Sequence, residues 1–153
     1  MTPPSFLLFC LAVAALACSQ ASARIVAMSV SKKHQRPGRP FQVHFRTTNY
    51  IANNDQYTIA FSLTPINHND GKSLGSSPFQ VSDIRHVNKR PPGFDVNVTI
   101  PADYRFNNAT EYLHAAVFGT VGASGAVTVD YFNTTLIVPR TPSPSSASSI
   151  SRE

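Results

Sequence analysis

The chain has 153 residues, and its 13 lysines and arginines outnumber eight aspartates and glutamates, which gives a formal net charge of +5. Its two cysteines, Cys10 and Cys18, both lie in an N-terminal apolar segment, and tryptophan is absent from the sequence. The residues after this segment can therefore neither perform thiol chemistry nor hold a metal through cysteine.

The N-terminal segment has the layout of a secretory signal peptide. An apolar stretch of 13 residues, Phe6 to Cys18, precedes a small-residue segment in which Ala21 and Ala23 are placed as in an A-x-A cleavage site. The apolar stretch is too short to span a bilayer, which takes about 20 residues. We predict that residues 1–23 are a signal peptide cleaved after Ala23, so that the protein is secreted and extracellular. The C-terminus has no apolar tail, so neither a lipid anchor nor a membrane segment is expected.

Successive short β-strands are predicted from Val26 onward, because apolar residues recur at every second position between turn sequences. The sharpest alternation runs from Phe94 to Ile100, whereas Glu111 to Gly119 is apolar on both faces, as in a central strand. Gly119 to Gly125 contains three glycines and is predicted to be a hairpin loop. The predicted strands are Val26–Val30, Phe41–Phe45, Tyr57–Leu63, Phe79–Val87, Phe94–Ile100, Glu111–Gly119 and Val127–Val138.

The last predicted strand changes its apolar parity along its length. Its apolar residues are first Val127, Val129 and Tyr131, and then Phe132, Leu136 and Val138. A β-bulge would return both sets to one buried face, so we predict a bulge near Tyr131.

Seven strands at roughly ten-residue spacing predict a single immunoglobulin-like antiparallel β-sandwich over residues 24–138, without disulfides. A small up-and-down barrel is the alternative architecture. From Pro139 the composition changes to serine and proline, which cannot bury apolar surface, so residues 139–153 are predicted to be a disordered tail.

Three N-glycosylation sequons begin at Asn97, Asn108 and Asn133. Asn97 falls on the polar face of its predicted strand, and Asn108 falls in a predicted loop. Asn133 points outward if the last strand shifts its parity. All three can then carry a glycan without disturbing the core.

Basic residues gather in two predicted loops, which contain Lys32, Lys33, Arg36 and Arg39 in one and Arg85, Lys89 and Arg90 in the other. They are interpreted either as solvated loops or as an attraction to an anionic glycan, a membrane face or a negatively charged protein. The two loops are expected at opposite ends of the sandwich, which argues against one continuous anion-binding patch. An exported chain with no recognisable nucleic-acid module is not expected to bind nucleic acid.

Enzyme signatures are missing from the sequence. The segment Gly122-Ala-Ser-Gly125 does not have the spacing of a G-x-S-x-G nucleophile elbow. The carboxyl groups that could act in glycoside hydrolysis, Asp95, Asp103, Glu111 and Asp130, show no sign of convergence. The five histidines are dispersed, without a close pair and a third ligand. We therefore predict no catalytic residues, no metal site and no cofactor.

Six short segments match one known family in order and in spacing. They are Ala23–Val30, Pro37–Phe41, Thr48–Ile51, Tyr57–Phe61, Gly119–Ser124 and Phe132–Thr135. Together they resemble the necrosis-inducing secreted protein family of plant-associated fungi, over about Ala23 to Val138. Similarity is least from Pro65 to Arg90, and the segment Lys89–Gly93 and the serine-proline tail depart from the family.

The resemblance implies a secreted effector. Members of the family dampen pattern-triggered plant immunity by binding immune receptor-associated kinases, and some cause cell death in leaves. Carried over, this implies a non-enzymatic inhibitor of host kinases that acts as a monomer in the plant apoplast or after entry into host cells.

The predicted partner-binding residues are Asn49, Tyr50 and Ile51, which are chosen from this sequence alone. They place an aromatic side chain between two predicted strands, and tyrosine is favoured at interface hot spots. The alternative role for Tyr50 is to cover one end of the core.

Two further function classes remain open. One class is a secreted cell-wall or glycan-binding module, which is expected to have a flat row of exposed aromatic residues. The lack of tryptophan counts against this class. A carbohydrate- or ester-active enzyme is opposed by the missing nucleophile and acid pair. The fold class cannot choose among these functions, because sandwiches host many of them.

Overall fold

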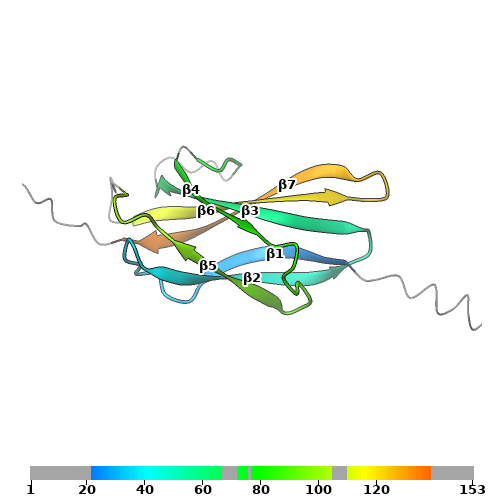
Figure 1. Ribbon diagram of the computed structural model, residues 1–153, viewed down its shortest axis with the longest axis horizontal. Coiled ribbons are helices and arrows are strands. Elements are labelled where there is room, and N and C mark those ends of the chain that lie inside the picture. The colour runs from blue at the N-terminus through cyan, green and yellow to red at the C-terminus, as the bar shows by residue number, and fades with distance from the viewer. Residues whose placement is uncertain (1–21, 67–71, 76, 105–109, 139–153) are drawn as a thin grey trace, which may run out of the picture.

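Seven antiparallel β-strands make up the described part of the chain, which is residues 22–66, 72–75, 77–104 and 110–138 of a computed structural model (Figure 1). The strands are β1 Ser22–Val30, β2 Pro40–Tyr50, β3 Asn54–Pro65, β4 Ser77–Asp83, β5 Gly93–Thr99, β6 Thr110–Val121 and β7 Ala126–Ile137. The predicted signal residues 1–21, Asn108 and the tail 139–153 lie outside the described residues. Within the described ranges, no helix is long and apolar enough to cross a membrane.

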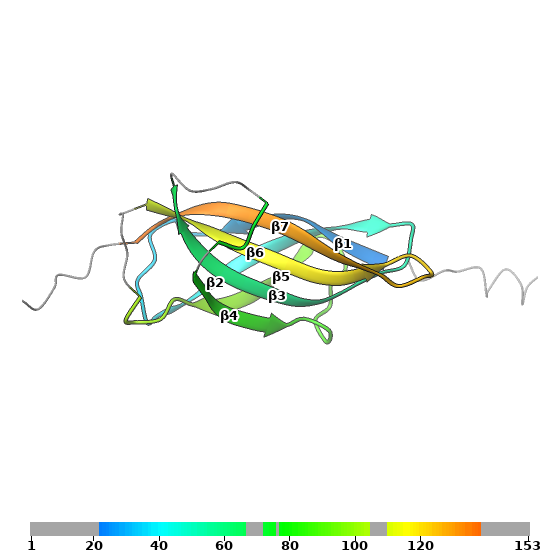
Figure 2. The same ribbon diagram turned by 90° about the horizontal axis from the view of Figure 1, so that it is seen from above.

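The strands form two sheets that pack face to face (Figures 1 and 2). One sheet has three strands in the order β1-β2-β5, and the other has four in the order β4-β3-β6-β7. All pairs of strands within the sheets are antiparallel, and the described residues contain no cysteine that could join the sheets. The predicted immunoglobulin-like sandwich is confirmed, and the barrel alternative is excluded by the two separate sheets.

The core lies between the inner faces of the two sheets and is centred on Phe45. The Phe45 side chain is fully buried, and its ring centroid lies 6.1 Å from that of Phe61 and 5.6 Å from that of Phe94. Phe45 and Phe94 are direct neighbours in the β2–β5 register, whereas Phe61 comes from the opposite sheet. The three rings therefore join both layers at one point. As predicted from its apolar faces, β6 is a central strand between β3 and β7.

The predicted bulge near Tyr131 is wrong. The β6–β7 register runs from Thr110 opposite Ile137 to Val121 opposite Ala126 without a shift. Because side chains alternate strictly along a strand, Val127, Val129 and Tyr131 lie on the outer face and are exposed. The inner positions beside them carry polar residues, including Asp130, whose carboxylate has hydrogen-bond partners on β1 and β3. Because the Asp130 carboxylate has these hydrogen-bond partners, it can remain on the inner face, and no bulge is needed to turn it toward solvent.

Hydrogen bonds occupy parts of the open sheet edges. The Gln80 side chain of β4 accepts a hydrogen bond from the Thr99 N–H at 2.9 Å and donates one to the Asn97 carbonyl at 2.8 Å. Near the end of β7, the Ile137 N–H donates to the Lys33 carbonyl at 2.8 Å, and the Gln35 N–H donates to the Ile137 carbonyl at 3.0 Å. These bonds satisfy backbone groups that would otherwise be free to pair with another chain.

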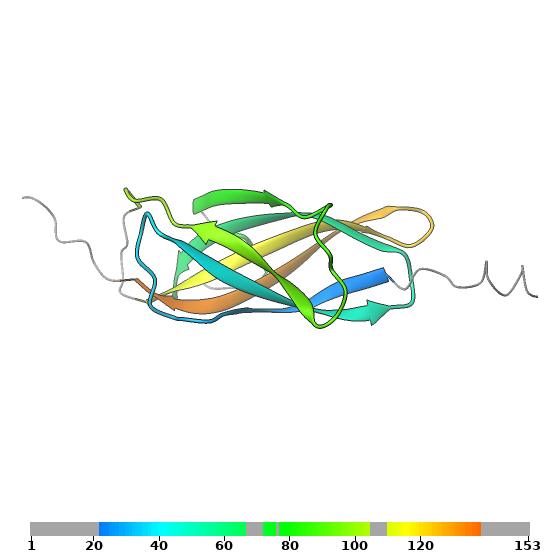
Figure 3. The same ribbon diagram turned by 60° about the horizontal axis from the view of Figure 1, so that its bottom comes forward.

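The two basic loops lie at opposite ends of the sandwich, as predicted (Figure 3). The start of β2 at Pro40 pairs with Thr99 at the end of β5, while Arg46 near the end of β2 pairs with Gly93 at the start of β5. The loop that precedes β2 and the loop that precedes β5 are therefore separated by the length of the sheet, and they do not form one basic patch.

Candidate binding surface

The predicted residues Asn49, Tyr50 and Ile51 lie at the end of β2 and in the turn that leads to β3. Asn49 is exposed, and the Ile51 side chain is completely exposed. Tyr50 is half-buried and does not belong to the hydrophobic core. Its ring instead lies under the guanidinium group of Arg24, whose central carbon is 5.3 Å from the ring centroid. The alternative role of Tyr50 as a cover for the core is therefore not supported by its contacts.

Arg24 is held at the edge where the two sheets meet. Its Nη2 atom lies 2.8 Å from Oδ1 of Asp130 on β7, and this hydrogen-bonded ion pair raises the pKa of Arg24 above its usual value. The other oxygen of the same carboxylate accepts a hydrogen bond from Nε2 of Gln56 at 3.4 Å. The backbone N–H of Ile25 donates to Oε1 of Gln56 at 3.0 Å. One buried glutamine on β3 therefore links β1 to the Asp130 carboxylate on β7 that pairs with Arg24.

Around Arg24 lies a shallow depression of about 390 Å³, which is lined by residues of β1, β2 and β7, among them Val26, Tyr50 and Tyr131. The β1–β2 register shifts between Ile25 and Ala27, and the Val26 side chain at this shift is exposed. We use the name seam surface for four residues that line this depression, Arg24, Val26, Tyr50 and Tyr131, together with three exposed residues next to them in the strands and the turn. These three are Ile51, which follows Tyr50, and Val127 and Val129, which share the outer face of β7 with Tyr131. The outer face of β7 continues it toward the β6–β7 turn. Five of the seven large exposed hydrophobic residues in the described ranges belong to it.

Sequence reasoning found Tyr50 and Ile51 but missed the other members of the seam surface. Val127, Val129 and Tyr131 were assigned to the core because alternating apolar residues usually mark a buried face. Arg24 and Asp130 are 106 positions apart, so their pairing has no local signal. The sequence did contain one indication of the outer apolar face. The two sets of apolar residues in the last strand lie on opposite faces of a regular strand, so one set had to face outward unless the strand contained a bulge.

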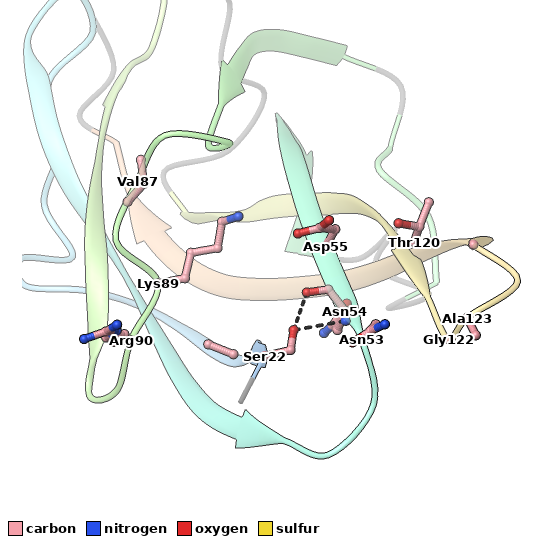
Figure 4. Close-up of a pocket in the computed structure, with 12 residues that line it drawn as sticks. Ser22, Asn53, Asn54, Asp55, Val87, Lys89, Arg90, Thr120, Gly122 and Ala123 are labelled. Carbon is pink, nitrogen blue, oxygen red and sulfur yellow. Dashed lines mark hydrogen bonds between the residues drawn. The ribbon is translucent and has the colours of Figure 1, made fainter. Parts of the chain in front are cut away.

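A second, polar hollow lies between the start of β3, the loop that precedes β5 and the β6–β7 turn (Figure 4). It has a volume of about 480 Å³ and is lined by Ser22, Asn53, Asp55, Lys89 and Thr120, among others. Partial burial lowers the pKa of Lys89, and the carboxylates of Asp55 and Asp83 oppose that shift. Figure 4 shows the Lys89 side chain extending across the hollow toward the strand that carries Asp55.

Neighbouring carboxylates compensate much of the charge of this basic loop. Arg85 donates hydrogen bonds to the Asp83 carboxylate, which lower the pKa of Asp83 to about 2. Lys89 lies in the fields of Asp55 and Asp83. A compensated loop attracts a distant anion less than its count of basic residues suggests.

The described residues show no grouping of three histidine, cysteine, aspartate or glutamate side chains that could hold a metal. The candidate carboxyl groups have separate surroundings. Asp95 contacts His44 at 2.8 Å on the exposed outer side of the three-stranded sheet, Asp130 pairs with Arg24, and Glu111 is buried on β6. These three carboxyl groups therefore lie on three different strands and in three different surroundings.

Two of the three sequon asparagines can be placed. Asn97 on β5 and Asn133 on β7 are both exposed. Asn133 shares the outer face of β7 with Tyr131, two residues away, so a glycan on Asn133 would border the seam surface. A glycan on either asparagine would leave the core undisturbed.

The fold defines the class of this protein as an immunoglobulin-like β-sandwich module whose described part needs no disulfide. The sequence profile of the Nis1 family matches residues 21–137, which include all seven strands. The chain belongs to the Nis1 family. Among curated proteins, none matches the chain at a significant level.

Several solved structures are similar to the sandwich. They include a DUF3823 family protein of Bacteroides ovatus, with 13% identity, a TM-score of 0.48 and coverage of 75% of this chain and 53% of that one. The sporulation control protein Spo0M of Bacillus subtilis has 14% identity, a TM-score of 0.46 and coverage of 79% and 51%. A cohesin module of a Clostridium perfringens family 33 glycoside hydrolase has 14% identity, a TM-score of 0.38 and coverage of 74% and 96%. The chain spans about half the length of the first two proteins.

Proposed function

We propose that this protein is a secreted effector that suppresses pattern-triggered immunity in plants by binding and inhibiting immune receptor-associated kinases, without enzymatic activity of its own. Membership of the Nis1 family over residues 21–137 supports the proposal, together with the resemblance of six segments to the necrosis-inducing secreted proteins. The protein would act in the apoplast or after entry into host cells, and induction of host cell death would be a further consequence.

The seam surface is the observation that carries a binding function. It combines exposed apolar side chains with two tyrosines and an arginine, which are residue types enriched at interface hot spots. The ion pair of Arg24 with Asp130 and its contact with Tyr50 restrict the side chains before a partner arrives. Restricting them in advance reduces the entropy lost on binding. The surface therefore has both the composition and the rigidity that a protein–protein contact favours.

The surface also lies along strands that bound the two sheets. β1 and β7 are each an edge strand of their sheet, and they contact one another at the seam. A rigid sandwich that presents such an edge can dock on a kinase domain and block either its activity or its access to substrate.

Replacing one exposed apolar residue of the seam surface with aspartate is expected to weaken kinase binding about tenfold. The reason is that the substitution puts an unpaired charge where the bound kinase would otherwise cover an apolar side chain. Val127→Asp and Ile51→Asp are the test variants. Val81→Asp is the matched control, because Val81 is 69% exposed against 73% for Val127 and lies on β4 at the far edge of the same sheet. Each variant would be secreted from the full chain in yeast and measured by biolayer interferometry against cytoplasmic domains of plant immune co-receptor kinases.

Saturable binding of the native protein to the immune kinases at physiological salt, and not to an unrelated kinase, is the expected result. Equal binding to the unrelated kinase, or none to any, would contradict the proposal. Salt-resistant binding to insoluble chitin or glucan instead would favour a glycan-binding module. If Val81→Asp weakened kinase binding as much as Val127→Asp, the kinase would be bound through another surface.

A further inference from the structure

We propose that Asn133 carries an N-glycan whose first sugar, an N-acetylglucosamine, packs on the ring of Tyr131 and so stabilises the fold. The sugar becomes part of the outer face of β7 and covers apolar surface there. The inference rests on the secretion that the proposed function requires, because N-glycans are attached on the secretory route. It goes beyond that function by giving one sequon a structural role.

Asn133 and Tyr131 are neighbours on the outer face of a regular strand. The β6–β7 register has no shift, so side chains two positions apart on β7 point to the same side. Asn133 is exposed, and Tyr131 is 41% exposed. Two such positions are about 7 Å apart along a strand. A sugar linked to the Asn133 side chain can therefore lie over the Tyr131 ring.

Tyr131 is the aromatic neighbour of Asn133 whose ring is open to a sugar. On β6 the residue opposite Asn133 is His114, which is 2% exposed, and Tyr112, diagonally across, has a ring centroid 6.1 Å from that of His114. One face of a pyranose ring consists of C–H groups, which pack on an aromatic ring while the hydroxyl groups of the sugar stay in water. The first sugar can therefore bury apolar surface on Tyr131 and keep its own hydration.

The outer face of β7 has an unusual composition that such a cover explains. The solvated face of an antiparallel sheet normally carries polar residues, whereas β7 presents Val127, Val129 and Tyr131 to water. Apolar area removed from water stabilises the folded state in proportion to its size. A sugar on Tyr131 removes part of this area from water in the folded protein alone, because the unfolded chain does not hold the two residues in this arrangement.

The fold decides where the glycan lies, and the sequon decides whether it is attached. The residues Asn133, Thr134 and Thr135 form an N-x-T sequon that is recognised in the unfolded chain. Because the Asn133 side chain faces away from the core, the chain can fold with the glycan in place.

Asn97 provides an internal comparison, because it has the same kind of sequon on an outer face without an aromatic neighbour. Two positions before it lies Asp95, whose carboxylate contacts His44 at 2.8 Å, and the residue opposite Asn97 on β2 is Gln42. All three of these neighbours are exposed. Their polar groups are already well solvated by water, so a sugar on Asn97 gains little from contact with them.

The glycan would close only one end of the seam surface. Tyr131 lies at the end next to Asn133, whereas Val127 is six positions from Asn133, or about 20 Å along the strand. The part of the seam surface at the β6–β7 turn is therefore left open to a protein partner.

A double-mutant cycle between Asn133 and Tyr131 tests the inference. The native protein, Asn133→Gln, Tyr131→Ser and the double variant would be secreted from the full chain in yeast, and their melting temperatures measured by circular dichroism. Asn133→Gln is expected to lower the melting temperature by about 4 °C in the native background and by about 1 °C in the Tyr131→Ser background. Asn97→Gln is the matched control and is expected to lower it by about 1 °C at most.

Enzymatic trimming tests the role of the first sugar directly. Endoglycosidase H leaves one N-acetylglucosamine on each asparagine and is expected to leave the melting temperature unchanged. Complete removal with peptide N-glycosidase is expected to lower the melting temperature of the native protein by about 4 °C. The same treatment of Asn133→Gln is expected to change it by about 1 °C at most. Mass spectrometry of the secreted protein measures the occupancy of Asn133.

Equal losses from Asn133→Gln in the two backgrounds would overturn the inference while leaving secretion and kinase binding intact. A secreted protein with an unmodified Asn133 would overturn it in the same way. Loss of stability on trimming to the first sugar would also contradict it, because the stabilising contact would then lie further along the glycan. A chain that stays in the cells without any glycan would overturn secretion itself, and the inference with it.

Discussion

Phe45→Ala is expected to lower the free energy of unfolding by about 4 kcal/mol. Phe45 is fully buried, and its ring packs against Phe94 within its own sheet and against Phe61 across the core. Removal of the ring therefore leaves a cavity where both layers meet, and close-packed neighbours can collapse into it only in part. Urea unfolding of the native protein and the variant, followed by circular dichroism, measures the loss.

Phe79→Ala makes the same chemical change at the rim of the core and serves as the matched control. Phe79 is only partly buried, and its ring contact with Tyr104 has a centroid distance of 6.4 Å. We expect a loss of about 2 kcal/mol there, because less surface is returned to water and the rim can relax. Equal losses in the two variants would show that the sandwich is not centred on Phe45.

Gln56→Leu is expected to cost about 3 kcal/mol, although leucine is close to glutamine in volume. Gln56 is 2% exposed and accepts the hydrogen bond of the buried Ile25 N–H. The variant leaves that donor without its partner and removes the hydrogen bond to Asp130. The cost of an unsatisfied buried group exceeds the gain from the added apolar surface. Denaturant unfolding measures this variant as well.

Gln80→Leu is the matched control for this second change. Gln80 also joins two strands through its side chain, but its hydrogen bonds to Asn97 and Thr99 lie in exposed surroundings. Water can replace them, so the expected loss is about 1 kcal/mol. If Gln56→Leu were no worse than Gln80→Leu, the bond to Ile25 would not hold the seam together.

Gln56→Leu also connects stability to the proposed binding. Without the glutamine, the Asp130 carboxylate loses one hydrogen bond and keeps its ion pair with Arg24, so the orientation of both side chains is less restricted. Binding to the kinase should therefore weaken even under conditions where the variant is fully folded. Unchanged kinase affinity would place the partner contact away from Arg24.

The positions of the strands were predictable because they follow from the alternation of apolar and polar residues that are close together in the sequence. The alternation from Phe94 to Ile100 puts four apolar side chains on one face, and all four are buried in the structure. The two apolar faces of β6 predicted its central place between β3 and β7. In both cases burial acts on positions two residues apart, so a local pattern suffices.

The candidate binding surface was only partly predictable. Tyr50 and Ile51 were found because they lie together in a turn between two strands. Tyr131 was predicted on the buried face of its strand but lies on the outer face. The prediction was wrong because a strand with alternating apolar residues has the same sequence pattern whether its apolar face is buried or exposed. The β6–β7 register decides that face, and the register depends on a whole hairpin and not on one strand.

The sequence by itself determined the all-β class, the number of strands and their approximate positions, because each follows from the local period of apolar residues and from turn residues. Only the tertiary structure decided which residues share the seam surface and which residues join the start of β1 to the start of β3. Arg24 meets Asp130 and Ser22 meets Asn54 across separations of 106 and 32 residues. Contacts of that kind form when the two sheets pack on each other. Packing brings together strand edges that are far apart in the sequence, so no local sequence pattern predicts these contacts.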